Sequence, residues 1–343
     1  MKKHAIIPIF IPHKGCPNDC VFCNQKKITA RTADVTPEDA RRTIEQYLMT
    51  LEGRGLDVIE VAFFGGSFTG IPLEEQSAFL AVADEYKQSG RIKKIHLSTR
   101  PDYINREILD NLKRYHTDII ELGVQSFDDE VLKKCKRGHT AKDVEQAAKL
   151  IHEYGFTLGL QLMIGLPGDS KETCIESAKR AVELKPAIAR LYPTVVINET
   201  ELADMYRAGT YTALSTAEAV DITKDMYRIL TEAGVQVIRV GLKNTDLIND
   251  GGPESQVLAD FHPSFRQLMD SAIAREDIER GMAEIGNGAK AVELVASPLS
   301  FDALSGYRGS NREWFIRRFP GVKFTFVMDD SVPADTYIVC EIK

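Results

Sequence analysis

Short apolar runs rich in β-branched residues alternate with longer amphipathic segments over the first two hundred residues. Thr36, which is followed by Pro37, and Thr140 are good helix N-caps, so each predicts the start of a helix between two apolar runs. Strands that alternate with helices indicate βαβ units and therefore an α/β fold with a parallel sheet. The apolar runs predict six strands, at 5–11, 58–64, 92–98, 118–124, 156–164 and 187–196.

The pattern changes at 244–256, a polar and Gly-rich stretch that predicts a linker or long loop. We therefore expect one domain over 1–243 and a small C-terminal α/β lobe over 244–343, a candidate substrate-binding element. The lobe is predicted to hold a helix at about 263–285, a strand at 290–296, an Arg-rich helix at 307–319 and two final strands.

Composition narrows the class of protein. With 43% hydrophobic and 27% charged residues, the 343-residue chain resembles a soluble globular protein. A net charge of −7 excludes a global basic field that would recruit nucleic acid, and it leaves local basic patches open. The N-terminal apolar run contains Pro8 and Pro12 and is too short to span a bilayer. We therefore expect a cytoplasmic protein without a membrane segment, in which cysteines stay reduced.

Three of the six cysteines, Cys16, Cys20 and Cys23, lie within eight residues. A structural zinc site needs four protein ligands, and no fourth Cys or His completes one at the expected distance. A redox disulfide would use only Cys20 and Cys23. A [4Fe–4S] cube held by three thiolates leaves one iron with open coordination sites, where a substrate or cofactor can bind. The spacing therefore points to a metal centre or to thiol chemistry.

The CxxxCxxC spacing, with Phe22 before the last cysteine, resembles the cluster motif of the radical S-adenosylmethionine (SAM) superfamily. The resemblance implies a [4Fe–4S] cluster on Cys16, Cys20 and Cys23 and a partial (β/α)6 TIM-like barrel. It also implies that SAM binds the open iron and is cleaved reductively to a 5′-deoxyadenosyl radical, which abstracts hydrogen from the substrate. The electron would come from a reductant such as flavodoxin or ferredoxin.

SAM contacts are expected at the carboxyl ends of the strands, where parallel α/β sheets bind ligands. Two features depart from the superfamily pattern: Ser67 replaces the acid of a Gly-Gly-Glu-like turn, and Ser98 stands where relatives have an acid. The expected contacts combine glycines for close approach, amides for hydroxyl groups and a guanidinium for the carboxylate of SAM. They are Gly65, Gly66, Gln125, Arg137, Gln161 and Gly165.

Longer segments, including "ELGVQSFDDEVL", "MIGLPGD" and "RLYPTVVINETEL", resemble the catalytic subunit of Elongator, which modifies transfer RNA. The resemblance runs from about residue 6 to about residue 242. It implies a transferase or oxidoreductase that abstracts hydrogen during tRNA modification. About a hundred residues follow position 243 without a Gly-rich loop to cradle a pyrophosphate, so we expect no acetyltransferase domain in them.

The sequence does not identify the substrate. Arginines beside aromatic residues at 307–319 favour RNA, whereas Trp314 and Phe315 also suit the core of an amphipathic helix with a solvated arginine face. Tyr192 and Arg239, near the ends of late apolar runs, either face the substrate or make buried hydrogen bonds. The alternatives are a radical enzyme for a small metabolite such as a tetrapyrrole, and a non-catalytic iron–sulfur protein. The candidate tRNA contacts are Arg308, Arg312, Arg317 and Arg318.

Overall fold

The structure, a computed structural model, describes residues 3–11, 20–24, 35–286 and 288–342. The chain forms two compact units. The large unit contains Met1–Leu214 and Met226–Phe261, and the small unit contains Ser215–Asp225 and His262–Lys343. No helix in the described part of the chain is both long and apolar enough to cross a membrane.

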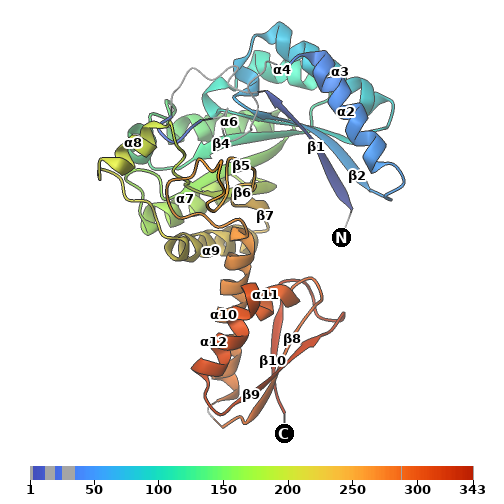
Figure 1. Cartoon of the computed structure of the whole chain (residues 1–343). Helices are drawn as coiled ribbons and strands as arrows, with labels where there is room; N and C mark the ends of the chain where they lie inside the picture. The colour runs from blue at the N-terminus through green and yellow to red at the C-terminus, as the bar shows by residue number, and fades with distance from the viewer. Residues whose placement is uncertain (1–2, 12–19, 25–34, 287, 343) are drawn as a thin grey trace. The chain divides into compact units, whose positions relative to one another are not determined.

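The large unit is built on a seven-stranded parallel sheet in which the strands follow one another in sequence order and curl into a half-barrel (Figure 1). The predicted α/β class and partial barrel are confirmed, with one strand more than the six predicted. The seventh strand was missed because Gln236 and Arg239 interrupt its apolar pattern. The strands are β1 (His4–Ile11), β2 (Val58–Gly65), β3 (Lys94–Thr99), β4 (Ile119–Gln125), β5 (Thr157–Ile164), β6 (Ile188–Pro193) and β7 (Gln236–Val240).

Helices join successive strands of the large unit. The predicted N-caps are present: Thr36 and Thr140 each accept a hydrogen bond from the backbone N–H three residues on and complete a capping box. The helices are α2 (Pro37–Leu51), α3 (Leu73–Gln88), α4 (Arg106–Arg114), α5 (Asp129–Lys134), α6 (Ala141–Glu153), α7 (Lys171–Glu183) and α8 (Glu201–Arg207), with α9 (Thr216–Glu232) shared between the units, and short 3₁₀ turns η1 (Phe68–Gly70) and η2 (Pro101–Tyr103).

The two faces of the sheet differ in chemistry. Phe63 of β2 packs its ring against Phe68 and Phe79, so this face belongs to the apolar core beneath α3. Side chains alternate along a strand, and Glu60 and Phe64 of β2 therefore lie on the opposite face. That second face, called here the inner face, carries the polar residues described below.

Residues 244–256, which the sequence predicts to be a linker or long loop, belong to the large unit and contain no helix or strand. The chain pairs there with residues 196–198: the Asn198 N–H donates to the Gln256 carbonyl at 2.7 Å, and the Leu258 N–H donates to the Val196 carbonyl at 2.9 Å. Ile248, with 1% of its surface exposed, packs with Val195 and Ile197. The segment is thus anchored just beyond the carboxyl end of β6.

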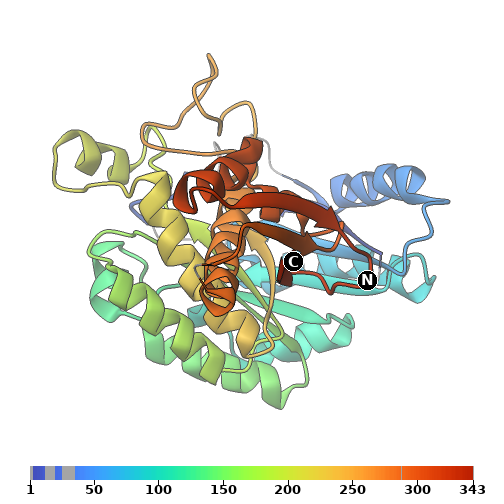
Figure 2. The same ribbon diagram turned by 90° about the horizontal axis from the view of Figure 1, so that it is seen from below.

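The small unit contains a three-stranded sheet, whose strands have the red colours of the C-terminal residues in Figure 2. Its order is β10-β8-β9, with β8 and β9 parallel and β10 antiparallel to β8. Its core includes Val292, Leu294 and the fully buried Phe315, against which Trp314 packs at 5.4 Å between ring centroids. The elements are α10 (Phe265–Ile285), β8 (Ala291–Ala296), α11 (Phe301–Ser305), η3 (Tyr307–Gly309), α12 (Ser310–Arg318), β9 (Lys323–Met328) and β10 (Tyr337–Glu341).

Candidate cofactor and substrate site

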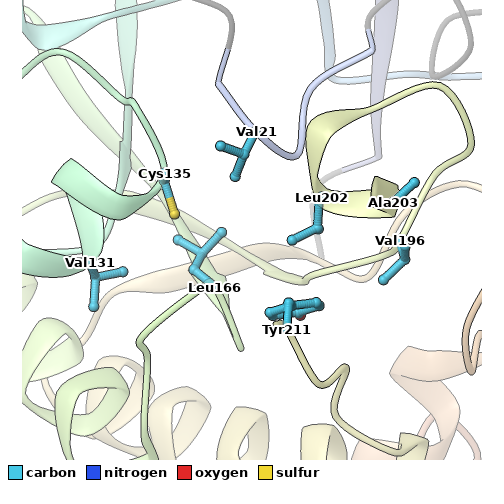
Figure 3. Close-up of a cluster of buried hydrophobic side chains, with 8 residues drawn as sticks. All are labelled: Val21, Val131, Cys135, Leu166, Val196, Leu202, Ala203 and Tyr211. Atoms are coloured by element: carbon cyan, nitrogen blue, oxygen red, sulfur yellow. The ribbon is translucent and has the colours of Figure 1, made fainter. Parts of the chain in front are cut away.

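The segment with Cys20 and Cys23 is held by the residue after Cys20. Val21 has 1% of its surface exposed and packs into an apolar cluster (Figure 3). Its N–H donates to the Cys135 carbonyl at 3.1 Å, and its carbonyl accepts from the Leu202 N–H at 2.7 Å. The other cluster members come from α5, α8 and the segments that follow β5, β6 and α8: Val131, Cys135, Leu166, Val196, Leu202, Ala203 and Tyr211.

Cys20 and Cys23 therefore have defined positions relative to the sheet, and the Cys23 N–H closes a turn onto the Cys20 carbonyl at 2.9 Å. Cys16 lies outside the described residues, and no group of three metal-ligating side chains occurs within the described ranges. Cys135, although near Cys20, is a poor ligand candidate: burial raises the pKa of its thiol to about 12.

Arg137 connects the cysteine segment to β4. Its Nη2 donates to the Gly123 carbonyl at 2.7 Å, and its Nη1 lies 3.6 Å from the Cys20 sulfur, within hydrogen-bonding range for sulfur. A Cβ at position 123 would lie 2.8 Å from the guanidinium, so any larger residue there would displace Arg137 from this position. A guanidinium in this position can donate a hydrogen bond to the sulfur of a cluster ligand. The residues present therefore fit a cluster ligand at Cys20.

Position 65, at the end of β2, requires glycine because a side chain there would collide with the backbone of β1. It adopts φ +117°, and a Cβ there would lie 2.6 Å from the Ile11 carbonyl oxygen. The next residue, Gly66, donates its N–H to the same oxygen at 3.0 Å. Ser67 follows, and its buried hydroxyl bonds to the Thr99 hydroxyl at 2.8 Å, which ties this turn to the end of β3. These contacts are structural, and contact of Gly65 and Gly66 with SAM stays a prediction.

The end of β4 has an irregular backbone. Gln125 adopts φ +71°, and the register with β5 shifts between Gly123 and Gln125. His139 supports this turn, because its Nε2 lies 3.2 Å from the Val124 carbonyl oxygen. Burial, and after it the positive charge of Arg137, lowers the pKa of His139 to about 3. The imidazole is thus neutral and donates from Nε2 to the carbonyl.

Gly165, which follows β5, is held by hydrogen bonds to both its N–H and its carbonyl. Its N–H donates to Asp169 Oδ2 at 3.1 Å, and its carbonyl accepts from the Tyr211 hydroxyl at 2.7 Å. A Cβ there would lie 2.6 Å from Leu214. Asp169 Oδ2 also accepts from the Cys174 thiol at 3.0 Å. The turn predicted to contact SAM is therefore held by hydrogen bonds on both sides of Gly165.

A row of charged residues crosses the inner face. Glu60 of β2 accepts from His96 of β3 at 2.9 Å, and the other ring nitrogen of His96 lies 3.5 Å from Glu121 of β4. Glu121 also accepts from Arg190 of β6 at 2.8 Å and from the amide of Gln161 of β5. Five neighbouring strands, β2 to β6, are thus linked by a single row of polar side chains.

The electrostatics of this row follow from burial. Burial alone would raise the pKa of Glu121, but the charge of Arg190 and the His96 hydrogen bond outweigh it and lower that pKa to about 2. Burial opposes the charged form of His96, but Glu121 and Glu60 outweigh it and raise its pKa. Phe64 covers the row: the Arg190 guanidinium lies 4.7 Å from its ring centroid, and the His96 ring stands edge-on at 5.4 Å. The row is therefore a charge-balanced network.

The structure places most of the predicted SAM contacts at or beyond the carboxyl ends of the strands and one of them, Gln161, within the sheet. Gly65, Gly66, Gln125 and Gly165 lie at strand ends or in the turns that follow, and Arg137 lies beside Cys20. Gln161, expected to contact SAM, has Glu121 as its partner within the sheet. Sequence reasoning missed Glu60, His96, Glu121 and Arg190; the signal was a single polar residue flanked by apolar residues in each strand.

Comparison with known protein families gives the same assignment as the arrangement of these residues. The profile of the Radical SAM superfamily matches residues 10–181, about half of the chain, and that of the radical SAM C-terminal domain matches residues 186–275. The chain belongs to the radical SAM superfamily. It is therefore a radical SAM enzyme, and the family implies a [4Fe–4S] cluster and SAM as its cofactors.

Among relatives, the tRNA uridine(34) acetyltransferase of Methanocaldococcus jannaschii is 27% identical over 257 residues, covering 64% of this chain and 47% of that protein. Elongator complex protein 3 of Saccharomyces cerevisiae is 27% identical over 240 residues, covering 61% and 43%. The chain thus spans about half the length of these curated relatives. The predicted resemblance to the Elongator catalytic subunit is confirmed.

The fold has a solved counterpart. The archaeal Methanocaldococcus infernus Elp3 with an N-terminal deletion aligns with a TM-score of 0.61 and 22% identity, covering 80% of this chain and 64% of that one. At this identity the match supports the radical SAM fold.

We expect Val21→Ala to reduce cluster loading as well as stability. The substitution removes two methyl groups from the cluster that positions Cys20 and Cys23, at a cost of about 2 kcal/mol in the free energy of unfolding. Iron and sulfide per chain after anaerobic reconstitution, together with urea unfolding, measure both effects. Val292→Ala, which removes the same atoms from the buried core of the small unit, is the matched control. Equal iron content in the two variants would contradict the positioning role of Val21.

We expect Glu121→Gln to cost about 3 kcal/mol at pH 7, because it leaves the buried Arg190 without its carboxylate and removes one of the two carboxylates beside His96. The folded-state pKa of Glu121 is about 2 and its ordinary value is 4.5, so its stabilising contribution is complete above pH 4.5 and is lost as the pH falls toward 2. The difference in unfolding free energy between the wild type and the variant should therefore shrink from pH 7 to pH 4. Glu145→Gln, at an exposed ion pair, is the control with an expected cost below about 1 kcal/mol. A pH-independent difference would refute the assigned charge state.

Proposed function

We propose that this radical SAM enzyme modifies transfer RNA. The observation that carries the proposal is the similarity over 257 residues to a protein that acts on uridine 34 of tRNA. Because the chain spans about half of that relative, the proposal concerns the radical step and the RNA class, and it leaves the acyl-transfer step aside.

In the proposed site, Cys16, Cys20 and Cys23 hold the cluster. When bound, the cluster and SAM supply a 5′-deoxyadenosyl radical for hydrogen abstraction, with a reductant such as flavodoxin or ferredoxin as the electron source. The position of Arg137 beside the Cys20 sulfur supports a second role, a hydrogen bond to the ligand sulfur. The proposed SAM contacts are Gly65, Gly66, Gln125, Arg137, Gln161 and Gly165.

The small unit offers exposed arginines for RNA phosphates. Arg312 lies 4.5 Å from the Phe326 ring centroid, a cation–π contact, and Arg318 lies 3.5 Å from Glu279. Trp314 and Phe315 pack into the core, so we assign this surface to phosphate contacts rather than to base stacking by these two rings. The proposed contacts are Arg308, Arg312, Arg317 and Arg318, all of them exposed.

The proposal is tested with anaerobically reconstituted protein, dithionite, SAM and bulk tRNA from a deletion strain. We expect 5′-deoxyadenosine and a mass change in a tRNA nucleoside, both detected by liquid chromatography and mass spectrometry. Cys16→Ala, Cys20→Ala and Cys23→Ala should each abolish the near-ultraviolet and visible absorption of the cluster together with both products. Cys174→Ala should keep them, because the Cys174 thiol is bonded to Asp169.

The outcomes separate the candidate functions. 5′-Deoxyadenosine without any change in tRNA would support a small-metabolite substrate, and no 5′-deoxyadenosine would support a non-catalytic iron–sulfur protein. Loss of absorption in Cys174→Ala would show that the cysteine ligands are wrongly assigned.

RNA binding through the small unit is tested by gel shift with tRNA across a salt series. Removing one arginine that neutralises a phosphate should reduce the slope of log K against log salt by about 1. We expect this reduction for Arg308→Gln and for Arg317→Gln. Arg280→Gln, on α10 of the same unit and paired with Asp277, is the control. If all three variants keep the wild-type slope, the arginines do not contact RNA.

A further inference from the structure

Two arginines lie side by side at the β7 edge of the inner face. Arg190 of β6 and Arg239 of β7 are cross-strand partners in the parallel register. Paired residues of parallel strands project to the same face of the sheet. Because Arg190 bonds to Glu121 on the inner face, Arg239 projects to that face as well.

Only one of these cations is neutralised by the described residues. The row contains two carboxylates: Glu60, which pairs with His4 and His96, and Glu121, which pairs with His96 and Arg190. Arg190 pairs with Glu121, whereas the side chain of Arg239 makes no hydrogen bond or ion pair within the described ranges. One positive charge therefore remains at the β7 end of the row, on a guanidinium with a free planar fork.

Tyr192 adds a neutral donor next to the two arginines. Its hydroxyl oxygen accepts from Arg190 Nη1 at 3.3 Å, and its own proton has no acceptor among the described residues. Burial, only partly offset by Arg190, raises the pKa of Tyr192, so the phenol stays protonated at neutral pH. Tyr192 lies two residues beyond Arg190 along β6, toward the carboxyl ends of the strands where SAM is expected.

We propose that Arg239, Arg190 and Tyr192 form a binding site for an oxyanion, a carboxylate or phosphate group, on the inner face of the large unit. That the oxyanion belongs to the molecule attacked by the radical rests on the proposed function. The site would then orient this molecule by a fork from Arg239 and a hydrogen bond from Tyr192. Arg190 is held in place by Glu121 and contributes its remaining N–H groups.

The site is tested by arginine-specific modification of the anaerobically purified full-length protein with phenylglyoxal, followed by peptide mass mapping. The probes are inorganic phosphate and acetate, each compared with chloride at constant ionic strength. We expect phenylglyoxal to modify Arg239 in chloride. One or both probes should lower this modification about threefold or more, because a guanidinium that holds an oxyanion with two hydrogen bonds is shielded from the reagent. Arg54, an exposed arginine, is the internal control and should show equal modification throughout.

Tyr192→Phe removes only the hydroxyl group. We expect it to raise the probe concentration needed to protect Arg239 about tenfold. Protection by phosphate only assigns a phosphate group, and protection by acetate only assigns a carboxylate. The proposal fails if Arg239 is unreactive in chloride, if neither probe protects it, or if Arg54 is protected equally. These measurements need neither SAM cleavage nor RNA, so their failure leaves the proposed function standing, and a failed tRNA assay leaves this site standing.

Discussion

The inner face of the sheet depends on one buried charge. Glu121 has no exposed surface, and a carboxylate in that position is tolerated only when cations and donors surround it. It has three such partners, His96, Gln161 and Arg190, each supplied by a different strand. The polar row is therefore also a constraint on the register of β3 to β6, because a shift of one residue in any of these strands would turn its partner to the other face.

A second constraint fixes the cysteine segment. Val21 attaches it to backbone groups that follow α5 and begin α8. Arg137 then joins the same segment to β4 through Gly123. The position of a cluster ligand is thus determined by an apolar contact and by hydrogen bonds that do not involve the metal, which is the arrangement expected where a cofactor site is preorganised.

Much of the fold can be predicted from the local pattern of residues in the sequence, whereas the polar site on the inner face can be predicted only in part. Six of the seven strands of the large unit, the N-caps at Thr36 and Thr140, and the glycines at the strand ends are visible in the sequence, because each depends on residues close in the chain. The ion pairs between Glu60, His96, Glu121 and Arg190 depend on register between strands tens of residues apart. A polar residue at an inward position can be noticed in each strand, as Gln161 was, but its partner cannot be read from one strand alone.

The contrast between Arg190 and Arg239 shows why one cation is paired and its neighbour is not. Arg190 is nearly buried, so its charge requires Glu121 to offset the cost of leaving water. Arg239 is partly exposed and keeps hydration, so it persists without a carboxylate. An oxyanion that reaches Arg239 replaces that water with a fork of donors in a setting of lower dielectric, where the interaction is stronger than in bulk solvent. The inner face therefore has a neutral, rigid half under Phe64 and a half with an uncompensated cation at β7. A site that recognises one polar group of a substrate needs this combination of a fixed frame and an available charge.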